Sequence, residues 1–336
     1  MPRPLRRLLL PVAALLLLAG LAACGDSSDD PKEASADSAP ASSGTASDAP
    51  SASAEDKAAL ATLKVTGDFG KEPKVEFSKV VEATGLASTT ITEGDGPAVA
   101  EGDSVFAQFW VGNGATQKQV YSSYDGKPQL LTLSDSLIPA IRDSLVGVKF
   151  GSRVLVVSAP AQAFGDTGNT QLGIGNADSV VFVIDVVSQL PDGPSGTDRT
   201  PAAWAPKIVS TDDVPTALDF AAAGKPSGRF QRTTVIQGNG PVTKTGDHLY
   251  VNYLGQVYGG DKPFDDSYSR GTPFDFDLGA GRVVAGWDQG LVGVKVGSRV
   301  ILQVPPKLGY GESGSPDAGI KGTDTMYFVV DVLAAN

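Results

Sequence analysis

The chain has 336 residues, a formal charge of -11, one histidine and one cysteine. This acidity argues against nucleic-acid partners and against electrostatic docking to a membrane surface. A single cysteine excludes an intrachain disulfide, and any His-dependent triad or multi-His metal site would rest on His248 alone. That histidine stands beside Leu249 at the start of an expected strand, where we interpret it as a solvated edge residue.

The N-terminus combines basic residues, an apolar run and the single cysteine. Three arginines precede the run from Leu8 to Leu21, which is too short to span a bilayer as a mature helix and is typical of a signal peptide. The run ends at Leu21-Ala22-Ala23-Cys24, which resembles the lipobox of bacterial lipoproteins, whose processing cuts before the cysteine and attaches lipid to its sulfur. We predict a signal peptide over 1–23, lipidation of Cys24 and an extracytoplasmic, lipid-anchored protein. Sec and twin-arginine export both stay open.

The segment after the cysteine is poor in large apolar side chains. From Gly25 to about Ala59 it consists mainly of Ser, Ala, Asp, Pro and Gly, so it cannot bury enough surface to offset the entropy of ordering. We predict that 24–59 is a lipidated, disordered tether that spans on the order of 30 Å.

The rest of the chain contains an internal duplication. LVGVKFGSRV at 145–154 recurs as LVGVKVGSRV at 291–300, and the flanking residues align over about 120 positions. The duplication predicts two folded domains, 60–190 and 205–336. Between them, 191–204 is rich in Pro, Gly and Ser and is predicted to be a linker.

The second repeat has the alternation of half-buried antiparallel strands. Apolar residues alternate with polar ones in four runs, at 249–257, 274–278, 300–304 and 326–332. Between the second and third runs, Val284, Trp287 and Leu291 lie on one face of a short helix. The expected fold class is α+β, with a twisted antiparallel sheet curled over one short helix in each domain and Trp287 pointing into the concavity.

Several linked segments of the second repeat then identify a resemblance. VNYLGQVY (251–258), PFDDS (263–267), RGTPFDFDLG (270–279), VVAGWDQGL (283–291), LGYGESG (308–314) and DTMYFVVDVL (324–333) occur in this order. Together they resemble the FKBP-type peptidyl-prolyl cis-trans isomerases. The resemblance implies that this domain catalyses isomerisation at X-Pro bonds of exported proteins, without a metal, nucleotide or redox cofactor.

The resemblance also implies a ligand pocket. Its catalytic residues would be Asp265, Tyr310, Trp287 and Phe264, and its substrate-binding residues Tyr253, Phe274, Val283, Val284, Ile320 and Phe328. Trp287 would form the floor, and the Tyr310 hydroxyl and the Ile320 backbone N–H would hold substrate carbonyls. Asp265 would shape the polarity of the pocket, beside Arg270. Partners would be proline-containing segments of exported proteins, with macrolides of the rapamycin type as further ligands, and no nucleic acid.

Two other patterns in this repeat are discounted. Asp265 and Asp266 are neighbours on a strand, so their side chains point to opposite faces and would not converge on one bond as paired catalytic carboxylates. GAGRVVAG at 279–286 is only superficially similar to a dinucleotide-binding turn, because its third glycine is misplaced and no parallel crossover units follow.

The first repeat keeps the frame of the second but differs at the pocket. The aligned residues of the second and first repeats are Tyr253 and Phe109, Phe264 and Val120, Asp265 and Tyr121, Phe274 and Gln129, Trp287 and Ile141, and Tyr310 and Phe164. We expect a degenerate domain that serves as a spacer or as a noncatalytic peptide-binding surface.

Two rival functions stay open for the whole chain. One is a noncatalytic, membrane-tethered peptide-binding chaperone or scaffold, and the other is a surface adhesion or structural protein that reuses the fold. The complete set of pocket residues in the second repeat favours the enzyme, whereas the altered set in the first is what the rivals predict in both.

Overall fold

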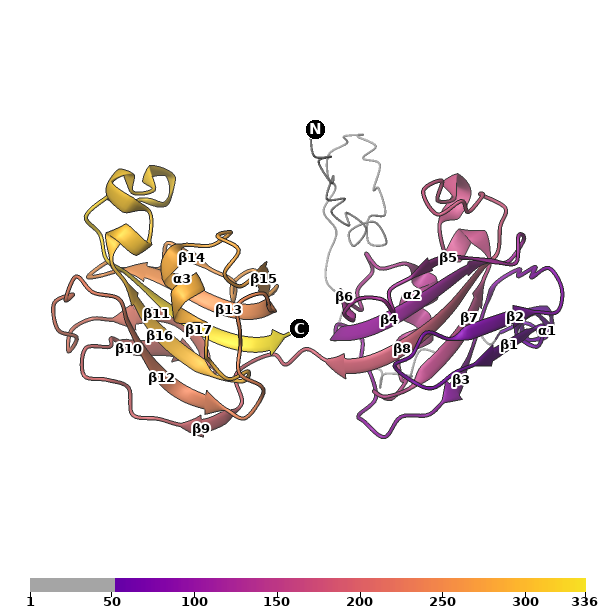
Figure 1. The fold of residues 1–336 in the computed structure, drawn as a ribbon, viewed down its shortest axis with the longest axis horizontal. Coiled ribbons are helices and arrows are strands. Elements are labelled where there is room, and N and C mark those ends of the chain that lie inside the picture. The colour runs from indigo at the N-terminus through magenta and orange to yellow at the C-terminus, as the bar shows by residue number, and fades with distance from the viewer. Residues whose placement is uncertain (1–51) are drawn as a thin grey trace, which may run out of the picture. The chain divides into compact units, whose positions relative to one another are not determined.

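The computed structural model describes residues 52–336, so the predicted signal peptide, Cys24 and most of the predicted tether lie outside the described residues. The chain divides into two compact units, 1–189 and 190–336. Figure 1 shows the strands and helices of each unit, and each unit has its own hydrophobic core. No helix of residues 52–336 is long and apolar enough to cross a bilayer.

The first unit consists of eight strands and two α-helices in its described part. They are α1 (Ala54–Leu60), β1 (Leu63–Thr66), β2 (Lys74–Phe77), β3 (Leu86–Thr92), β4 (Ser104–Asn113), β5 (Lys118–Ser122), β6 (Gln129–Thr132), α2 (Pro139–Leu145), β7 (Arg153–Ser158) and β8 (Val180–Gln189). The main sheet has the order β3-β7-β8-β4-β5, with β6 also paired to β4, and β1 and β2 form a separate hairpin. Every pair in the main sheet is antiparallel.

The second unit repeats this sheet and adds a strand. Its elements are β9 (Gly196–Asp198), β10 (Lys207–Thr211), β11 (Val214–Asp219), β12 (Gln231–Gly238), β13 (His248–Val257), β14 (Asp265–Asp266), β15 (Phe274–Asp277), α3 (Ala285–Gly290), β16 (Arg299–Val304) and β17 (Met326–Ala335). The sheet order is β14-β13-β17-β16-β12-β9, with β15 paired to β13, and β10 and β11 form a hairpin. The four predicted strand runs correspond to β13, β15, β16 and β17, and the predicted short helix corresponds to α3.

Each sheet is covered on both faces, which the sequence did not predict. One face packs on the short helix, α2 or α3, through the larger core of the unit. The opposite face carries a second cluster, formed in the first unit with α1, β1 and β2. In the second unit the β10–β11 hairpin supplies this cover, where Leu218 packs with Leu254 and Tyr327. Each sheet therefore lies between a helix layer and an N-terminal extension of the same unit.

Two predicted boundaries are wrong. The end of the predicted tether, 54–59, belongs to α1, where Asp56 N–H donates to the Ser53 side chain at 3.0 Å and the Asp56 carboxylate accepts from the Thr84 N–H at 2.8 Å. Part of the predicted linker forms β9, which pairs with β12 at the edge of the second sheet. Backbone pairing at a sheet edge does not require alternating apolar and polar side chains. A strand in a Gly- and Ser-rich segment, such as β9, therefore has no recognisable sequence pattern.

The helix α3 lies unusually close to the sheet because it contains glycine. A Cβ on Gly286 would lie 2.6 Å from Cγ1 of Val304, a distance that real side chains do not adopt. Glycine has a low helix propensity, but the missing side chain at position 286 lets α3 pack closely against Val304. This approach places the next residue, Trp287, in the core beneath the sheet, where it is 3% exposed.

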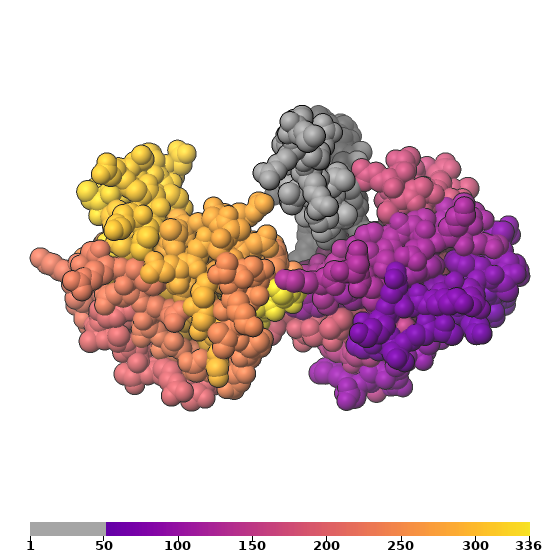
Figure 2. Space-filling model, in the orientation of Figure 1, coloured from indigo at the N-terminus to yellow at the C-terminus, as the bar shows by residue number. Residues whose placement is uncertain are grey.

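The loops between the last two strands of each main sheet form separate lobes. In the second unit this loop holds the 3-10 turns Pro306–Leu308, Gly311–Ser313 and Pro316–Ala318. Figures 1 and 2 show it in yellow, standing out from the surface of its unit, with the β7–β8 loop in the same relation to the first unit. Tyr310 is carried by this lobe, at the entry to the second 3-10 turn.

Candidate active site

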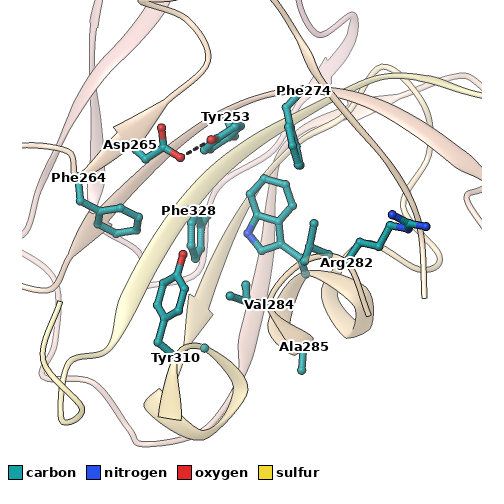
Figure 3. Close-up of a pocket in the computed structure, with 12 residues that line it drawn as sticks. Tyr253, Phe264, Asp265, Phe274, Arg282, Val284, Ala285, Tyr310 and Phe328 are labelled. Atoms are coloured by element: carbon teal, nitrogen blue, oxygen red, sulfur yellow. Dashed lines mark hydrogen bonds between the residues drawn. The ribbon is translucent and has the colours of Figure 1, made fainter. Parts of the chain in front are cut away.

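A cavity of about 530 Å³ opens in the second unit between α3, the strands that face it and the β16–β17 lobe (Figure 3). Its volume is in the range of small-ligand sites. The lining consists of Tyr253, Phe264, Asp265, Phe274, Arg282, Val283, Val284, Ala285, Trp287, Gly309, Tyr310 and Phe328. Nine of the ten predicted pocket residues are therefore brought together here, and Arg282, Ala285 and Gly309 join them.

The deep part of the cavity is built from perpendicular aromatic rings. The Trp287 ring lies 5.1 Å from that of Tyr253 at 83° and 5.3 Å from that of Phe328 at 87°. Phe264 packs edge-on against Phe328 at 5.8 Å. Such edge-to-face contacts stabilise each ring pair by about 0.5–1.5 kcal/mol beyond burial. They hold the floor and walls rigid without filling the space above the indole.

The indole N–H of Trp287 is buried and has no hydrogen-bond partner among residues 52–336. An unpaired buried donor costs about 1–3 kcal/mol. The floor is thus a large aromatic surface whose only polar atom is unused by the fold, and uncompensated groups of this kind in native structures call for an explanation other than stability.

One wall of the cavity carries a polar triad. The Tyr253 hydroxyl donates to Oδ2 of Asp265, the pair joined by the dashed line in Figure 3. Arg270 donates to the other carboxylate oxygen at 2.6 Å and to the Tyr253 hydroxyl at 3.0 Å. Burial, followed by the bond to Asp265, raises the pKa of Tyr253 to about 12, so its hydroxyl stays protonated at neutral pH.

This triad leaves Asp265 unsuited to proton transfer. Both carboxylate oxygens already accept hydrogen bonds, and the guanidinium of Arg270 balances the charge. Asp266, its neighbour, turns to Ser269, as expected for opposite faces of a strand. Asp265 therefore sets the polarity of the wall and orients the Tyr253 ring.

The mouth of the cavity is formed by more exposed side chains. Phe274 is 37% exposed and Tyr310 is 44% exposed, and no residue of the described structure is a hydrogen-bond partner of the Tyr310 hydroxyl. In Figure 3, Tyr310 and Phe264 lie on the side of the cavity opposite Phe274. A chain crossing the mouth would pass between Phe274 and Tyr310 and meet a free hydroxyl.

Ile320 does not belong to this site, contrary to the prediction. Its side chain is buried in the core and is absent from the cavity lining. Its backbone N–H donates to the Ser315 carbonyl at 2.9 Å, closing the turn of the lobe. This N–H is therefore not available to hold a substrate carbonyl. Local turn geometry sets its direction, and no side-chain pattern indicates that geometry.

The backbone N–H of Val284 is a better donor that sequence reasoning missed. Val284 is the N-cap of α3, its side chain lines the cavity, and within residues 52–336 its N–H has no acceptor. The first N–H groups of a helix lack partners inside the helix, so they are ready donors for a ligand. The predicted helix start at 284 was the signal that could have identified it.

The first unit has different side chains at the aligned positions. Strand pairing confirms the alignment: Gly255 lies opposite Asp265 and Val111 lies opposite Tyr121. Tyr121 accepts a hydrogen bond from Gln129 at 2.6 Å. Phe109, Val111 and Ile141 are buried in the same core. Val120 and Gln129 thus stand where the second unit has Phe264 and Phe274, whereas Phe182 keeps the aromatic position of Phe328.

His248 is more constrained than a solvated edge residue. Its two ring nitrogens lie 2.7 Å from Asp277 and 3.0 Å from Asp275, both on the paired strand β15. The bond to Asp275 is the main cause that raises the pKa of His248, and burial opposes it. No group of His, Cys, Asp and Glu in the described part of the chain could hold a metal ion.

Comparison with known proteins gives the same family for both units. The family described as FKBP-type peptidyl-prolyl cis-trans isomerase matches residues 96–187 and 240–333. A Streptomyces anulatus FK506-binding protein is 40% identical over 117 residues, which cover 35% of this chain and 94% of that protein. The Arabidopsis thaliana peptidyl-prolyl cis-trans isomerase FKBP15-2 is 48% identical over 91 residues, covering 27% and 55%. The solved structure of FkpA from Escherichia coli is 37% identical with a TM-score of 0.30, covering 34% of this chain and 53% of that one.

Proposed function

The chain belongs to the family of FKBP-type peptidyl-prolyl cis-trans isomerases, and from this premise we propose that the cavity of its second unit isomerises X-Pro bonds of exported proteins. The observation that carries the proposal is the joint presence of an aromatic floor, an internally balanced polar wall and two free donors around one cavity. A macrolide such as FK506, the ligand in the name of the Streptomyces relative, would compete for the same cavity.

The chemistry requires only that a twisted amide bind better than a planar one. The barrier to rotation of a peptide bond is about 18–20 kcal/mol because resonance is lost, and no bond is broken. The twisted amide has less charge separation than the planar forms, so an apolar enclosure favours it. The rings of Trp287, Phe264 and Phe328 supply that enclosure.

Two donors would orient the peptide on either side of the proline. The Tyr310 hydroxyl reaches the mouth from the lobe, and the Val284 N–H reaches it from the start of α3. Holding the flanking carbonyls fixes the ends of the segment while the central amide rotates, which is positioning rather than proton transfer. Asp265 acts on this site through Tyr253, whose ring it orients.

We propose that the first unit has no isomerase activity. Its counterparts of Trp287, Phe264 and Tyr310 are Ile141, Val120 and Phe164. Tyr121 and Gln129 are hydrogen bonded to each other where the second unit has Asp265 and Phe274. Without a flat floor or a free hydroxyl, this unit serves as a spacer between the membrane anchor and the catalytic unit.

The activity and its place are tested with matched variants of the full chain. Phe264→Ala removes a wall of the second cavity, and Val120→Ala changes the aligned position of the first unit. Loss of a buried aromatic contact predicts a fall of about tenfold or more in kcat/KM for a proline peptide in Phe264→Ala, and no change in Val120→Ala. FK506 should inhibit the wild type. Equal activity of the wild type and Phe264→Ala would reject this site.

We further propose that the mature protein is held at the membrane, outside the cytoplasm, by lipid on Cys24. The signal-like N-terminus supports this, and two or more acyl chains would make the attachment stable. Cys24→Ser should move the protein from the membrane fraction to the soluble extracytoplasmic fraction. A Cys24→Ser protein that still sediments with membranes would contradict lipid anchoring.

A further inference from the structure

Arg282 is the charged side chain of the cavity lining that the fold leaves unused. The other charged residue of the lining, Asp265, is paired with Arg270 at 2.6 Å. Arg282 has no hydrogen bond or ion pair with any residue of the described structure. An unpaired positive charge therefore extends from the rim of the cavity lining into solvent (Figure 3).

The backbone that carries Arg282 is fixed although its side chain is not. The Asp288 carboxylate accepts the N–H groups of Gly279 and Gly281 at 2.7 and 3.0 Å, which ties the turn before Arg282 to the start of α3. Arg282 is two residues before Val284, the free N–H donor of the cavity. A peptide held by that N–H would thus pass close to the backbone of Arg282, and a flanking side chain that extends beyond the cavity could reach the guanidinium.

Figure 3 shows on which side of the cavity the Arg282 side chain lies. Arg282 extends away from Tyr310 and Asp265, on the side of Phe274. Its charge is therefore placed at one end of a bound segment, not over the rotating amide. Its effect falls on residues that flank the proline.

We propose that Arg282 is a specificity-determining residue that favours X-Pro segments with an aspartate or glutamate beside the proline. This inference rests on the proposed isomerase function and names its preferred substrates. An exposed ion pair of this kind predicts a preference of about 1.5- to 5-fold for an acidic flanking residue over alanine. A lysine at the same position is disfavoured by like-charge repulsion.

The local charge acts against the field of the whole chain. With the three arginines of the signal removed, the formal charge of -11 becomes -14 (-11 minus 3), which repels acidic peptides at long range. The comparison needs a control with the same change of net charge. Arg199 supplies it, because it is exposed on the far edge of the second sheet, next to β9, and is not part of the cavity lining.

The experiment uses the full chain and a set of short peptides in which the residues before and after a single proline are alanine, glutamate or lysine in turn. Isomerisation is followed for the wild type, Arg282→Gln, Arg282→Glu and Arg199→Gln, at about 0.02 and 0.5 M salt. The measured quantity is the ratio of kcat/KM for each glutamate or lysine peptide to that of its alanine counterpart. A ratio within one variant is independent of any change in its overall activity.

The expected wild-type ratio for one glutamate position is about 1.5 to 5 at low salt and falls toward 1 at high salt. Arg282→Gln should lose this preference, Arg282→Glu should invert it in favour of lysine, and Arg199→Gln should keep it. Equal ratios in the wild type and Arg282→Gln overturn the inference and leave the isomerase proposal standing. No acceleration of any peptide by the wild type overturns both.

Discussion

The two units share the pairing of their central strands but differ in the side chains that face the short helix. In the second unit Gly255 lies under two aromatic rings, and a Cβ there would be 2.7 Å from Phe264 and 2.8 Å from Phe328. In the first unit the aligned residue is Val111, and Val120 replaces the aromatic wall. Glycine at position 255 thus occurs together with the ring of Phe264, and Val111 occurs together with the smaller Val120, whereas Phe182 keeps the position of Phe328.

The buried ion pair of the sheet, in contrast, is the same in both units. Arg153 lies 2.6 Å from Asp185 in the first, and Arg299 lies 2.6 Å from Asp331 in the second. Removing one partner of such a pair leaves a buried charge and is strongly destabilising, so both copies keep it. The frame and the pocket therefore depend on different residues, and the pocket positions differ between the units while the fold is kept.

A single substitution at position 255 gives the pocket of the second unit the residue that the first unit has there, Val111. Gly255→Val should lower kcat/KM by on the order of 100-fold, because the new side chain displaces the rings of Phe264 and Phe328 from their packed positions. Prolyl isomerisation by the full chain measures the effect, with circular dichroism to show that the unit is still folded.

The matched variant is Val111→Gly in the first unit. It removes a buried side chain and should lower stability, but it should leave isomerase activity unchanged, because the first unit has no aromatic floor. A folded Gly255→Val protein with wild-type activity would mean that the rings of the second unit do not form the catalytic surface.

A smaller effect is expected from the hydroxyl at the mouth. Tyr310→Phe gives the second unit the residue that the first has at the aligned position, Phe164. Loss of one hydrogen bond to the substrate predicts a decrease of about 2- to 13-fold in kcat/KM. The reciprocal variant Phe164→Tyr should not change the measured rate. An unchanged rate in Tyr310→Phe would leave the Val284 N–H as the one donor proposed for substrate carbonyls.

The sequence was sufficient to predict the parts of this molecule that repeat or alternate. The strands at β13 and β16 follow from period-two patterns, and the position of Trp287 follows from helical spacing. Nine of the ten pocket residues were found by resemblance to a family, since the aromatic rings come from elements far apart in the chain. Their mutual orientation was not readable, because it depends on how closely α3 approaches the sheet.

The parts that escaped prediction depend on backbone groups or on neighbours across strands. The composition of 191–204 predicts a linker because the pairing of β9 with β12 uses backbone atoms, and the close contact of Gly196 with Gln237 leaves no side-chain pattern. The motif places Ile320 in the pocket, although a local turn occupies its N–H. No sequence pattern indicates Arg282, because only the folded structure shows that its charge is unpaired.

The stability of the second unit should depend weakly on pH near neutrality, because the only histidine of the chain, His248, lies in this unit. His248 bridges Asp275 and Asp277 on β15, the strand that also carries Phe274. Its pKa is raised in the folded state, so the stabilisation that it gives is fully present below the ordinary value of about 6.5 and is lost as pH rises through the raised pKa.

Denaturant unfolding of the full chain between pH 5 and 9 should therefore show a small loss of stability above pH 6.5 in the transition that reports the second unit, which holds Trp287 and Trp204. His248→Gln should flatten this dependence, because glutamine keeps hydrogen-bonding capacity but does not titrate. Phe274 at the mouth would loosen with β15 at high pH, so KM should rise over the same range in the wild type and not in the variant. If His248→Gln shows the same pH profile as the wild type, other groups cause the pH dependence. The contacts of His248 with Asp275 and Asp277 would then be hydrogen bonds that both protonation states of the imidazole maintain.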